Sequence, residues 1–194
     1  AARWMKDVGR GLTRGYVITF DYGDLAEGLY TPERSRGTIV SYYRHTPESD
    51  PYARIGSRDI TAHANFTTLM QAGMQTSLRP IGMLTQRKFL QNLGIDLFME
   101  KMRHRRMGDR ERQANRMAQR ELINPEGLGG FRVLLQGKAA PEAPLAAMGK
   151  DESFKADLQE RLKVLPTPLL GDRHLDLMAG KYPHLSGEWE ELLT

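Results

Sequence analysis

The sequence predicts an α/β fold in which strands alternate with helices. Apolar, β-prone runs cover residues 15–23, 38–43 and 131–137, and a weaker strand-like run covers residues 75–81. Segments with helical periodicity separate these runs, which is the order expected of an α/β sandwich. A chain of 194 residues, 40% hydrophobic and 27% charged, suits one globular domain with room for a second small unit.

The N-terminal third of the chain alternates between helix and strand. Residues 4–12 are expected to form the last turns of a helix. The run 15–23 carries no charge before Asp21, which suggests burial on both faces, as in the middle of a parallel sheet. Residues 38–43 are a short strand candidate, and the following residues 44–59 are rich in Pro, Ser, Asp and Gly, which predicts a long loop or lid.

The middle of the chain is predicted to be mainly helical. Residues 60–73 have helical spacing, with Asp59 or Thr61 as the N-cap. Residues 85–93 form a second helix, capped by its own first threonine and closed by Gly94.

The C-terminal half begins with a long helical stretch over residues 95–122 that is interrupted at Gly108. We divide the chain into a main unit, residues 1–138, and a C-terminal unit, residues 139–194. The segments that follow the long helix are a turn at 127–130, the strand at 131–137, an Ala/Pro-rich linker at 139–147, an amphipathic helix at 153–165 and an arm over the main domain at 166–194.

The composition excludes several classes of protein. The chain has no cysteine, which rules out a disulfide scaffold, a thiolate zinc site and a cysteine nucleophile, and fits a reducing compartment such as the cytoplasm. No apolar run approaches the roughly 20 residues that a membrane span needs. The chain begins without Met, which is expected of a processed product or a fragment.

Positive charge is concentrated in one segment. The net charge is only +4, but residues 101–120 carry eight basic side chains against Asp109 and Glu111. Such a block is either a solvated helix face or a surface that binds RNA, an acidic protein or anionic lipid. The block lacks interleaved aromatic residues for stacking bases, so sequence-specific binding of single-stranded RNA is not favoured. The eight residues are Lys101, Arg103, Arg105, Arg106, Arg110, Arg112, Arg116 and Arg120.

Common catalytic motifs are absent from the sequence. There is no H-E-x-x-H, no phosphate-binding P-loop, no G-x-S-x-G and no G-x-G-x-x-G that opens a helix after a strand. The glycines of residues 127–130 precede a strand, so we interpret them as a turn. The histidines have no spacing that suggests a metal site, and no metal is predicted.

Three segments carry side chains suited to chemistry. Asp21, Tyr22 and Gly23 lie at the end of the first strand, where open α/β sheets bind ligands, although a strand-end Asp also caps turns. A cluster of polar side chains precedes residue 66, where such residues either bind a charged substrate or cap a helix. A histidine follows the second strand; it is either part of a binding edge or a structural residue. These residues are Asp59, Thr61, His63 and Asn65 in the cluster, and His45 after the strand.

Together these segments resemble the MidA-like S-adenosylmethionine-dependent methyltransferases, which include the mitochondrial complex I assembly methyltransferase. The most specific parts are the D-Y-G strand end at residues 21–23 and the D-I-T-A-H-A-N-F segment at residues 59–66. The resemblance extends from residue 14 to residue 134, through the stretches 14–23, 37–45, 50–51, 59–66, 85–95 and 124–134.

The resemblance implies that this chain is the C-terminal half of a Rossmann-like methyltransferase fold, followed by a C-terminal helical arm. Residues 16–20, 75–80 and 131–136 would be strands 5, 6 and 7, with strand 7 antiparallel between the other two. The cofactor is S-adenosylmethionine, but the family's glycine-rich loop and its acidic ribose-binding residue belong to an N-terminal half that these residues lack. The chain alone is therefore expected to be inactive, to expose an apolar edge strand, and to aggregate or need a partner.

The resemblance also assigns roles to residues. Catalysis is assigned to Asp21, Tyr22, Gly23 and His63, although the mitochondrial relative has an acidic residue in place of His63. The implied substrate is a protein arginine, whose guanidinium Asp21 and Asp59 would hold. The residues on the substrate side are His45, Asp59, Thr61, Asn65 and Gln86.

The partners expected from the resemblance are a protein substrate and the N-terminal half of the same fold, with nucleic acid not favoured and a homo-oligomer allowed. The location is cytoplasmic, or the mitochondrial matrix for eukaryotic relatives. The alternative function is a binding module without catalysis that uses residues 101–120 to bind an acidic protein or RNA. Steep loss of binding with salt would distinguish this alternative from the enzyme.

Overall fold

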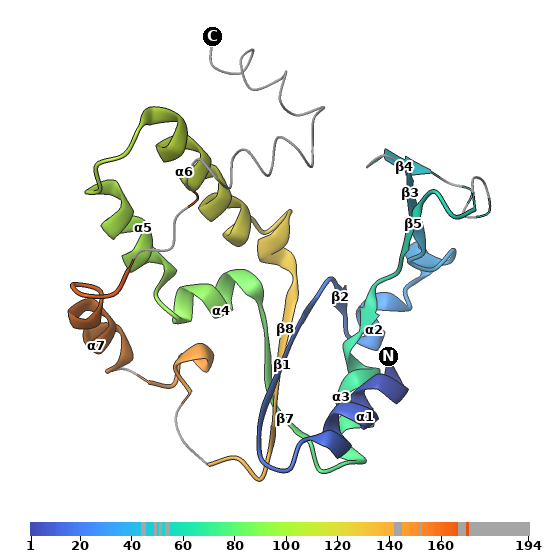
Figure 1. Ribbon diagram of the computed structural model, residues 1–194. Coiled ribbons are helices and arrows are strands. Elements are labelled where there is room, and N and C mark those ends of the chain that lie inside the picture. Colours follow the sequence, from blue (N-terminus) through green and yellow to red (C-terminus); the bar gives the residue numbers. More distant parts are fainter. Residues whose placement is uncertain are drawn as a thin grey trace.

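A three-stranded sheet forms the centre of the molecule (Figure 1). The computed structural model describes residues 1–43, 46–48, 50, 52, 55–141, 145–151, 153–166 and 170. In the sheet, β8 (Arg132–Lys138) lies between β1 (Gly15–Asp21) and β7 (Arg79–Thr85) and is antiparallel to both. This is the order and direction that the resemblance implied for these three strands. Because β1 and β7 are parallel, both end at the same edge of the sheet.

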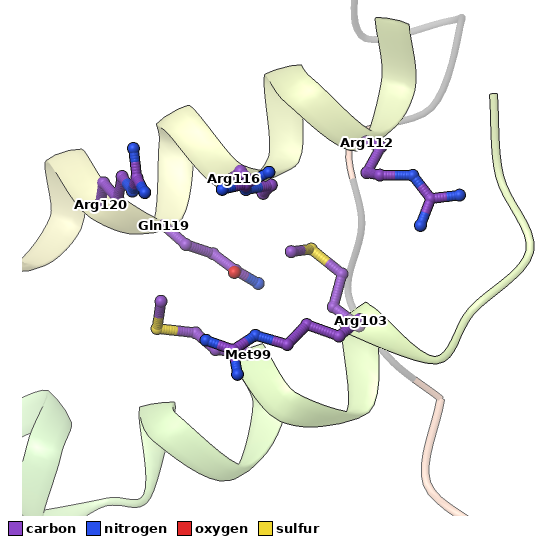
Figure 2. Close-up of a pocket in the computed structure, with 7 residues that line it drawn as sticks. Met99, Arg103, Arg112, Arg116, Gln119 and Arg120 are labelled. Carbon is purple, nitrogen blue, oxygen red and sulfur yellow. The ribbon is translucent and has the colours of Figure 1, made fainter. Parts of the chain in front are cut away.

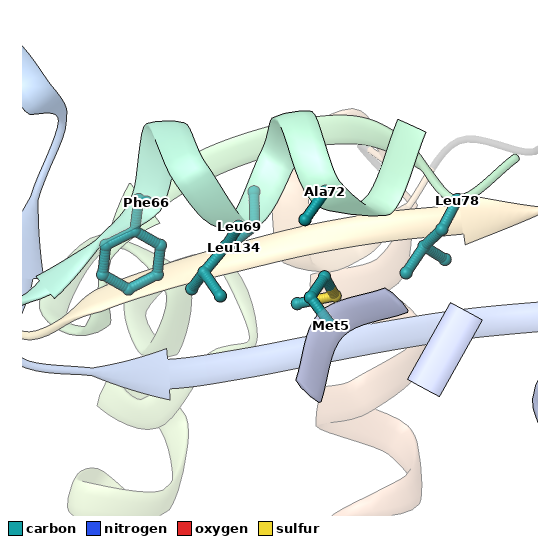
Figure 3. Close-up of a cluster of buried hydrophobic side chains, with 6 residues drawn as sticks. All are labelled: Met5, Phe66, Leu69, Ala72, Leu78 and Leu134. Atoms are coloured by element: carbon teal, nitrogen blue, oxygen red, sulfur yellow. The ribbon is translucent and has the colours of Figure 1, made fainter. Parts of the chain in front are cut away.

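One face of the sheet is covered by α1 (Ala2–Gly11) and α3 (Phe66–Met74). Their apolar side chains meet the middle strand in the main hydrophobic cluster, shown in Figure 3. Close packing of this cluster holds the two helices and the strand as one unit. Its buried members are Met5, Phe66, Leu69, Ala72, Leu78 and Leu134.

The other face carries α4 (Gln86–Asn92), which follows directly after β7. The ring of Phe89 on α4 meets the ring of Phe20 on β1 edge-on, with 5.2 Å between centroids. Beyond α4 lie the helices of the second half of the chain (Figure 1). They are α5 (Ile95–Arg103), α6 (Asp109–Ile123) and α7 (Phe154–Arg161).

Two smaller sheets lie next to the edge at which β1 ends. In one, β2 (Gly23–Asp24) pairs in parallel with β6 (Ala64–Asn65). In the other, β3 (Val40–Tyr43) lies between two short strands and is antiparallel to both. The other short elements are β4 (Thr46–Glu48), β5 (Asp59–Thr61), α2 (Ala26–Leu29) and the 3₁₀ turns Pro32–Arg34, Leu128–Gly130 and Ala146–Met148.

Several predicted elements are present with shifted ends. The break near Gly108 is confirmed, because α5 ends at Arg103 and Gly108 is the N-cap of α6. Thr85 caps α4, with its Oγ1 accepting the N–H of Lys88, and Gly94 closes that helix with φ of 80°. The elements found where the sequence predicts them are α1, β1, β3, α4, β8 and α7.

Three predictions about elements are wrong. The helix expected at residues 60–73 begins only at Phe66, because the residues before it are extended and pair with β3 and β2. The strand expected at residues 75–81 is instead Arg79–Thr85. The first strand is not buried on both faces: Ile18 and Phe20 are 49% and 46% exposed, because β1 is an edge strand and pairs only with β8. The strand with buried residues on both faces is β8.

Two sequence predictions fall outside the described residues, namely His45 and most of the C-terminal arm, residues 171–194. In the part of the chain that the structure describes, no helix combines the length and apolar character needed to cross a bilayer.

Candidate active site

The two segments singled out in the sequence meet at the edge of the sheet where β1 ends. After Asp21 the chain continues into β2, which runs alongside β6. The N–H of Ala64 donates to the carbonyl oxygen of Tyr22 over 2.9 Å, and Gly23 and Asp24 lie opposite Ala64 and Asn65. Parallel pairing therefore brings residues 21–23 (D-Y-G) beside residues 63–65 (H-A-N).

Gly23 makes this close pairing possible. A Cβ atom at this position would lie 2.1 Å from the carbonyl oxygen of Ala64. No side chain fits in that space, so glycine is required for the approach of β2 to β6. In the structure, Gly23 allows β2 and β6 to pair, which keeps the two segments of the site side by side.

Aromatic rings form one wall of the site. The half-buried ring of Tyr22 lies edge-on to His63 and to Phe131, each with 5.7 Å between ring centroids. The exposed His63 has Nδ1 3.4 Å from Nη1 of Arg34, and its backbone N–H donates to Oγ1 of Thr38 over 3.1 Å. The histidine is thus positioned by its backbone and keeps its imidazole at the surface.

Two carboxylates follow the end of β1. Asp21 accepts the N–H of Tyr22 on Oδ1 over 2.8 Å, and no donor among the described residues reaches its Oδ2. Asp24 is fully engaged, because its Oδ1 accepts the N–H of Leu25 and its Oδ2 accepts Nη2 of Arg132, both over 2.9 Å. Burial raises the pKa of Asp24, but the hydrogen bonds from Arg132 and Leu25 and the charges of Arg132 and Arg34 outweigh it, so the pKa lies below its usual value.

The residues assigned to the substrate side are not all brought together. Asp59 is exposed on β5, opposite Tyr42, and Thr61 on the same strand donates from Oγ1 to the carbonyl of Val40 over 3.2 Å. Within the described residues, neither contacts Asp21 through a hydrogen bond or ion pair. Asp59 and Thr61 are therefore not at the start of a helix as predicted.

Asn65 and Gln86 are held by structural contacts. Asn65 is the N-cap of α3: its Oδ1 accepts the N–H of Thr68 over 3.0 Å, and its Nδ2 donates to the hydroxyl of Tyr30 over 3.2 Å. Gln86 is buried, and its Nε2 donates to the carbonyl of Leu122 over 2.9 Å. Both side chains stabilise the elements that surround the site.

Sequence reasoning missed Asp24, Arg132 and Arg34. The signal for Arg132 was available, because an antiparallel strand that starts at residue 132 must place its first residue beside the end of β1. In the structure Arg132 faces both Asp21 and Thr85 in the strand ladder. Arg34 reaches the site through a loop, and no sequence spacing indicates that contact.

Two glycine turns next to the candidate site do not fit the phosphate or ribose of a nucleotide. The glycines of the 3₁₀ turn Leu128–Gly130 pack against the chain's own backbone, since a Cβ on Gly129 would lie 2.3 Å from the carbonyl carbon of Ile123. Gly23 packs against Ala64 in the same way. Neither turn therefore leaves its glycine backbone open to a nucleotide. Across the same residues, no group of three or more His, Asp or Glu side chains is placed to hold a metal.

Comparison with known proteins gives a family match over part of the chain. Residues 1–84 match the model of a family described as "Putative S-adenosyl-L-methionine-dependent methyltransferase". This match contains the whole stretch from Asp21 to Asn65. Over these residues the chain is similar to a family described as S-adenosylmethionine-dependent methyltransferases. No curated protein matches the chain significantly.

Two solved structures from Burkholderia thailandensis are similar in fold to this chain. One is the native structure of an uncharacterized superfamily protein, 28% identical over 75% of this chain, with a TM-score of 0.65. The other is a member of the same superfamily bound to S-adenosyl-homocysteine, 29% identical over 76% of this chain, with a TM-score of 0.65. This chain spans only 38% of the length of either structure. The mixed α/β fold and S-adenosylmethionine as the family's cofactor are supported by these findings.

Proposed function

We propose that this chain supplies the substrate side of a MidA-like S-adenosylmethionine-dependent methyltransferase whose acceptor is a protein arginine. The observation that carries the proposal is the position of Asp21. Its carboxylate lies at the carboxyl end of β1, an edge strand antiparallel to β8, and its Oδ2 has no donor among the described residues. The ring of the next residue, Tyr22, lies against His63. In the proposed complete fold, β1 would join parallel strands, and ligands bind at the carboxyl ends of such strands in open α/β folds.

The side chains at this edge suit a guanidinium group. A carboxylate binds guanidinium through paired, charge-assisted hydrogen bonds, and aromatic rings stack against its plane. The edge already holds one guanidinium, that of Arg132, on Asp24. Asp21 offers a second carboxylate beside the Tyr22 ring, and we assign to it the binding and orientation of the substrate arginine.

The cofactor site, in this proposal, requires the N-terminal half of the same fold. The free edge of β1 and the half-exposed Ile18 and Phe20 are what a strand 5 without its neighbouring strand 4 would show. The low coverage of both solved structures, 38%, agrees with a chain that represents part of a longer fold.

Calorimetric titration of S-adenosyl-homocysteine tests this division. We would titrate this chain and, in parallel, the chain extended upstream along its gene. The proposal expects binding by the extended protein alone. Equal binding by both proteins would contradict the proposal that the cofactor site needs the N-terminal half of the fold. Binding by neither would contradict the proposal that the protein is a methyltransferase.

The arginine assignment has its own test. In the extended protein, Asp21→Asn should lower methyl transfer to a protein substrate at least about a hundredfold, since orientation of the acceptor contributes most of this step. The affinity for S-adenosyl-homocysteine should not change, and Glu27→Gln, a change at an exposed carboxylate on α2, is the matched control. Mass spectrometry of the hydrolysed product should show methylarginine; methyllysine would contradict the assignment.

A further inference from the structure

A cleft between α5 and α6 gathers four arginines, none of which belongs to the segments of the candidate active site. Its volume is about 360 Å³. In Figure 2, α6 lies above α5, and Gln119 points from α6 toward α5. The residues that line it are Met99, Met102, Arg103, Arg112, Arg116, Gln119 and Arg120.

Most of this positive charge is not neutralised within the described residues. Arg103 pairs with Glu100 over 2.9 Å, and Arg112 donates only to the carbonyl oxygen of Met107, over 3.1 Å. Arg116 and Arg120 make no ion pair or side-chain hydrogen bond in this part of the chain. Unpaired guanidinium groups held side by side repel one another and attract an anionic group.

The cleft also contains a polar acceptor without a donor. The Oε1 atom of Gln119 is buried and accepts no hydrogen bond from any described residue. A buried acceptor left without a donor destabilises the folded state, so a donor from a ligand is favoured there. The opposite wall has the buried Met102 and the half-buried Met99, which adapt to apolar side chains. The cleft therefore suits a ligand that carries an anionic group, an N–H donor and an apolar side chain. An acidic, partly apolar peptide has all three.

We propose that this cleft binds the acidic C-terminal segment of the same chain, residues 186–194. This segment has three glutamates, Glu188, Glu190 and Glu191, and no Lys or Arg. Trp189 and the pair Leu192 and Leu193 alternate with the acids. The glutamates match the free guanidinium groups, the backbone supplies N–H donors for Gln119, and Trp189 fits the methionine wall.

Leu170, which precedes this segment in the chain, is held next to the cleft. Leu170 donates its N–H to Oδ1 of Asn115 over 2.7 Å and accepts Nδ2 of the same residue over 2.8 Å. Asn115 lies on α6 one turn from Arg112. The intervening residues, 171–185, can span up to about 50 Å, whereas α6 is only about 22 Å long. The acidic segment therefore reaches every arginine of the cleft, and its attachment to the same chain gives it a millimolar effective concentration.

Quenching of Trp189 fluorescence by acrylamide tests the proposal on the full chain. Trp4→Phe removes the other tryptophan, which is half exposed on α1. Neutralising Glu188, Glu190 and Glu191 to Gln should raise the quenching constant of Trp189 about threefold, because Trp189 then leaves the apolar wall. Arg116→Glu together with Arg120→Glu should do the same, and adding Glu190→Arg should restore part of the protection. Salt at about 1 M should mimic the neutralised variant, since the Debye length falls to about 3 Å.

Matched controls separate the cleft from the rest of the basic block. Arg105→Gln with Arg106→Gln removes two exposed arginines of the block that do not line the cleft, and should leave the quenching constant unchanged. A wild-type constant equal to that of the neutralised variant would overturn the proposal. So would protection of Trp189 that depends on protein concentration, because that result places the segment on a second copy.

An RNA site is the competing outcome. Filter binding of a uridine decamer to the wild type and to the glutamate-neutralised variant distinguishes the two. The proposal expects the neutralised variant to bind any such RNA more tightly, because the segment no longer competes for the arginines. The proposal would be overturned if RNA binding is lost on substitution of Arg116 and Arg120 but is equally tight in the wild type and the glutamate-neutralised variant.

Discussion

Gly23 shows how a single residue decides whether the site forms. Gly23→Ala would place a methyl group 2.1 Å from the carbonyl oxygen of Ala64, and the nearest atoms are all backbone of Ala64, which cannot move aside as a flexible side chain does. We expect a loss of about 3 kcal/mol in the free energy of unfolding, measured by urea denaturation. The control is Gly11→Ala, at the end of α1, where no atom lies within 4 Å of the new Cβ. A Gly23→Ala variant as stable as the control would contradict the close pairing of β2 and β6.

The ion pair between Asp24 and Arg132 predicts a dependence of stability on pH. The pKa of Asp24 is below its usual value of 3.8 in the folded chain, so its contribution is complete above about pH 4 and is lost as pH falls through the lower folded value. Asp24→Asn should lower the free energy of unfolding at pH 7 by about 1–2 kcal/mol, because it removes a charged hydrogen bond to Arg132. Unfolding between pH 5 and about pH 2 should then be less sensitive to pH than in the wild type. Equal pH sensitivity would rule out this pair as its source.

At the residue scale, the sequence singled out part of the candidate site that the structure brings together. Asp21, Tyr22 and Gly23 could be predicted because a carboxylate and a glycine follow an apolar strand at a position where ligands bind. His63 was placed beside them only by the pairing of β2 with β6, which no spacing reveals. Asp24 and Arg132 were missed because their contact joins residues that lie 108 positions apart in the chain.

Two substitutions at Asn65, the N-cap of α3, distinguish its cap contact with Thr68 from its contact with Tyr30. Asn65→Ala should lower the free energy of unfolding by about 1 kcal/mol, because the N–H of Thr68 loses its cap. Asn65→Asp keeps an oxygen for that cap and should retain most of the stability, while losing the donor to Tyr30. Thermal unfolding of the two variants distinguishes the roles. A stability loss of equal size in both would mean that the contact with Tyr30, and not the cap, matters.

At the element scale, local signals predicted elements whose ends are set locally. The helix α4 has a threonine cap and a glycine stop within its own sequence, and both were identified. The extended strands β5 and β6 were predicted as helix, because residues 60–73 have helical spacing and residues such as Asp59 suit a helix start. Pairing with β3 and β2 overrides that preference, and such long-range pairing is not encoded in a local window.

On the scale of the whole molecule, the sheet has one edge that looks unfinished. Its middle strand is buried between two layers of helices, yet β1 leaves Tyr16, Ile18 and Phe20 between 37% and 49% exposed. The apolar sequence of β1 predicted a strand buried on both faces, because a local run of apolar residues does not reveal how many neighbours a strand has. In the described residues β1 pairs with β8 alone, so the predicted burial is not found.

Ile18 tests this interpretation of the edge. In this chain alone, Ile18→Thr should cost little stability, because the side chain is already 49% exposed, and should reduce aggregation measured by light scattering. In the chain extended upstream along its gene, the same change should lower the free energy of unfolding by about 2 kcal/mol, because the added strands bury the side chain. The control is Ile39→Thr, at a residue that is 64% exposed and lies outside the sheet, which should have a small effect in both proteins. An equally small effect of Ile18→Thr in both proteins would show that no further strand joins β1.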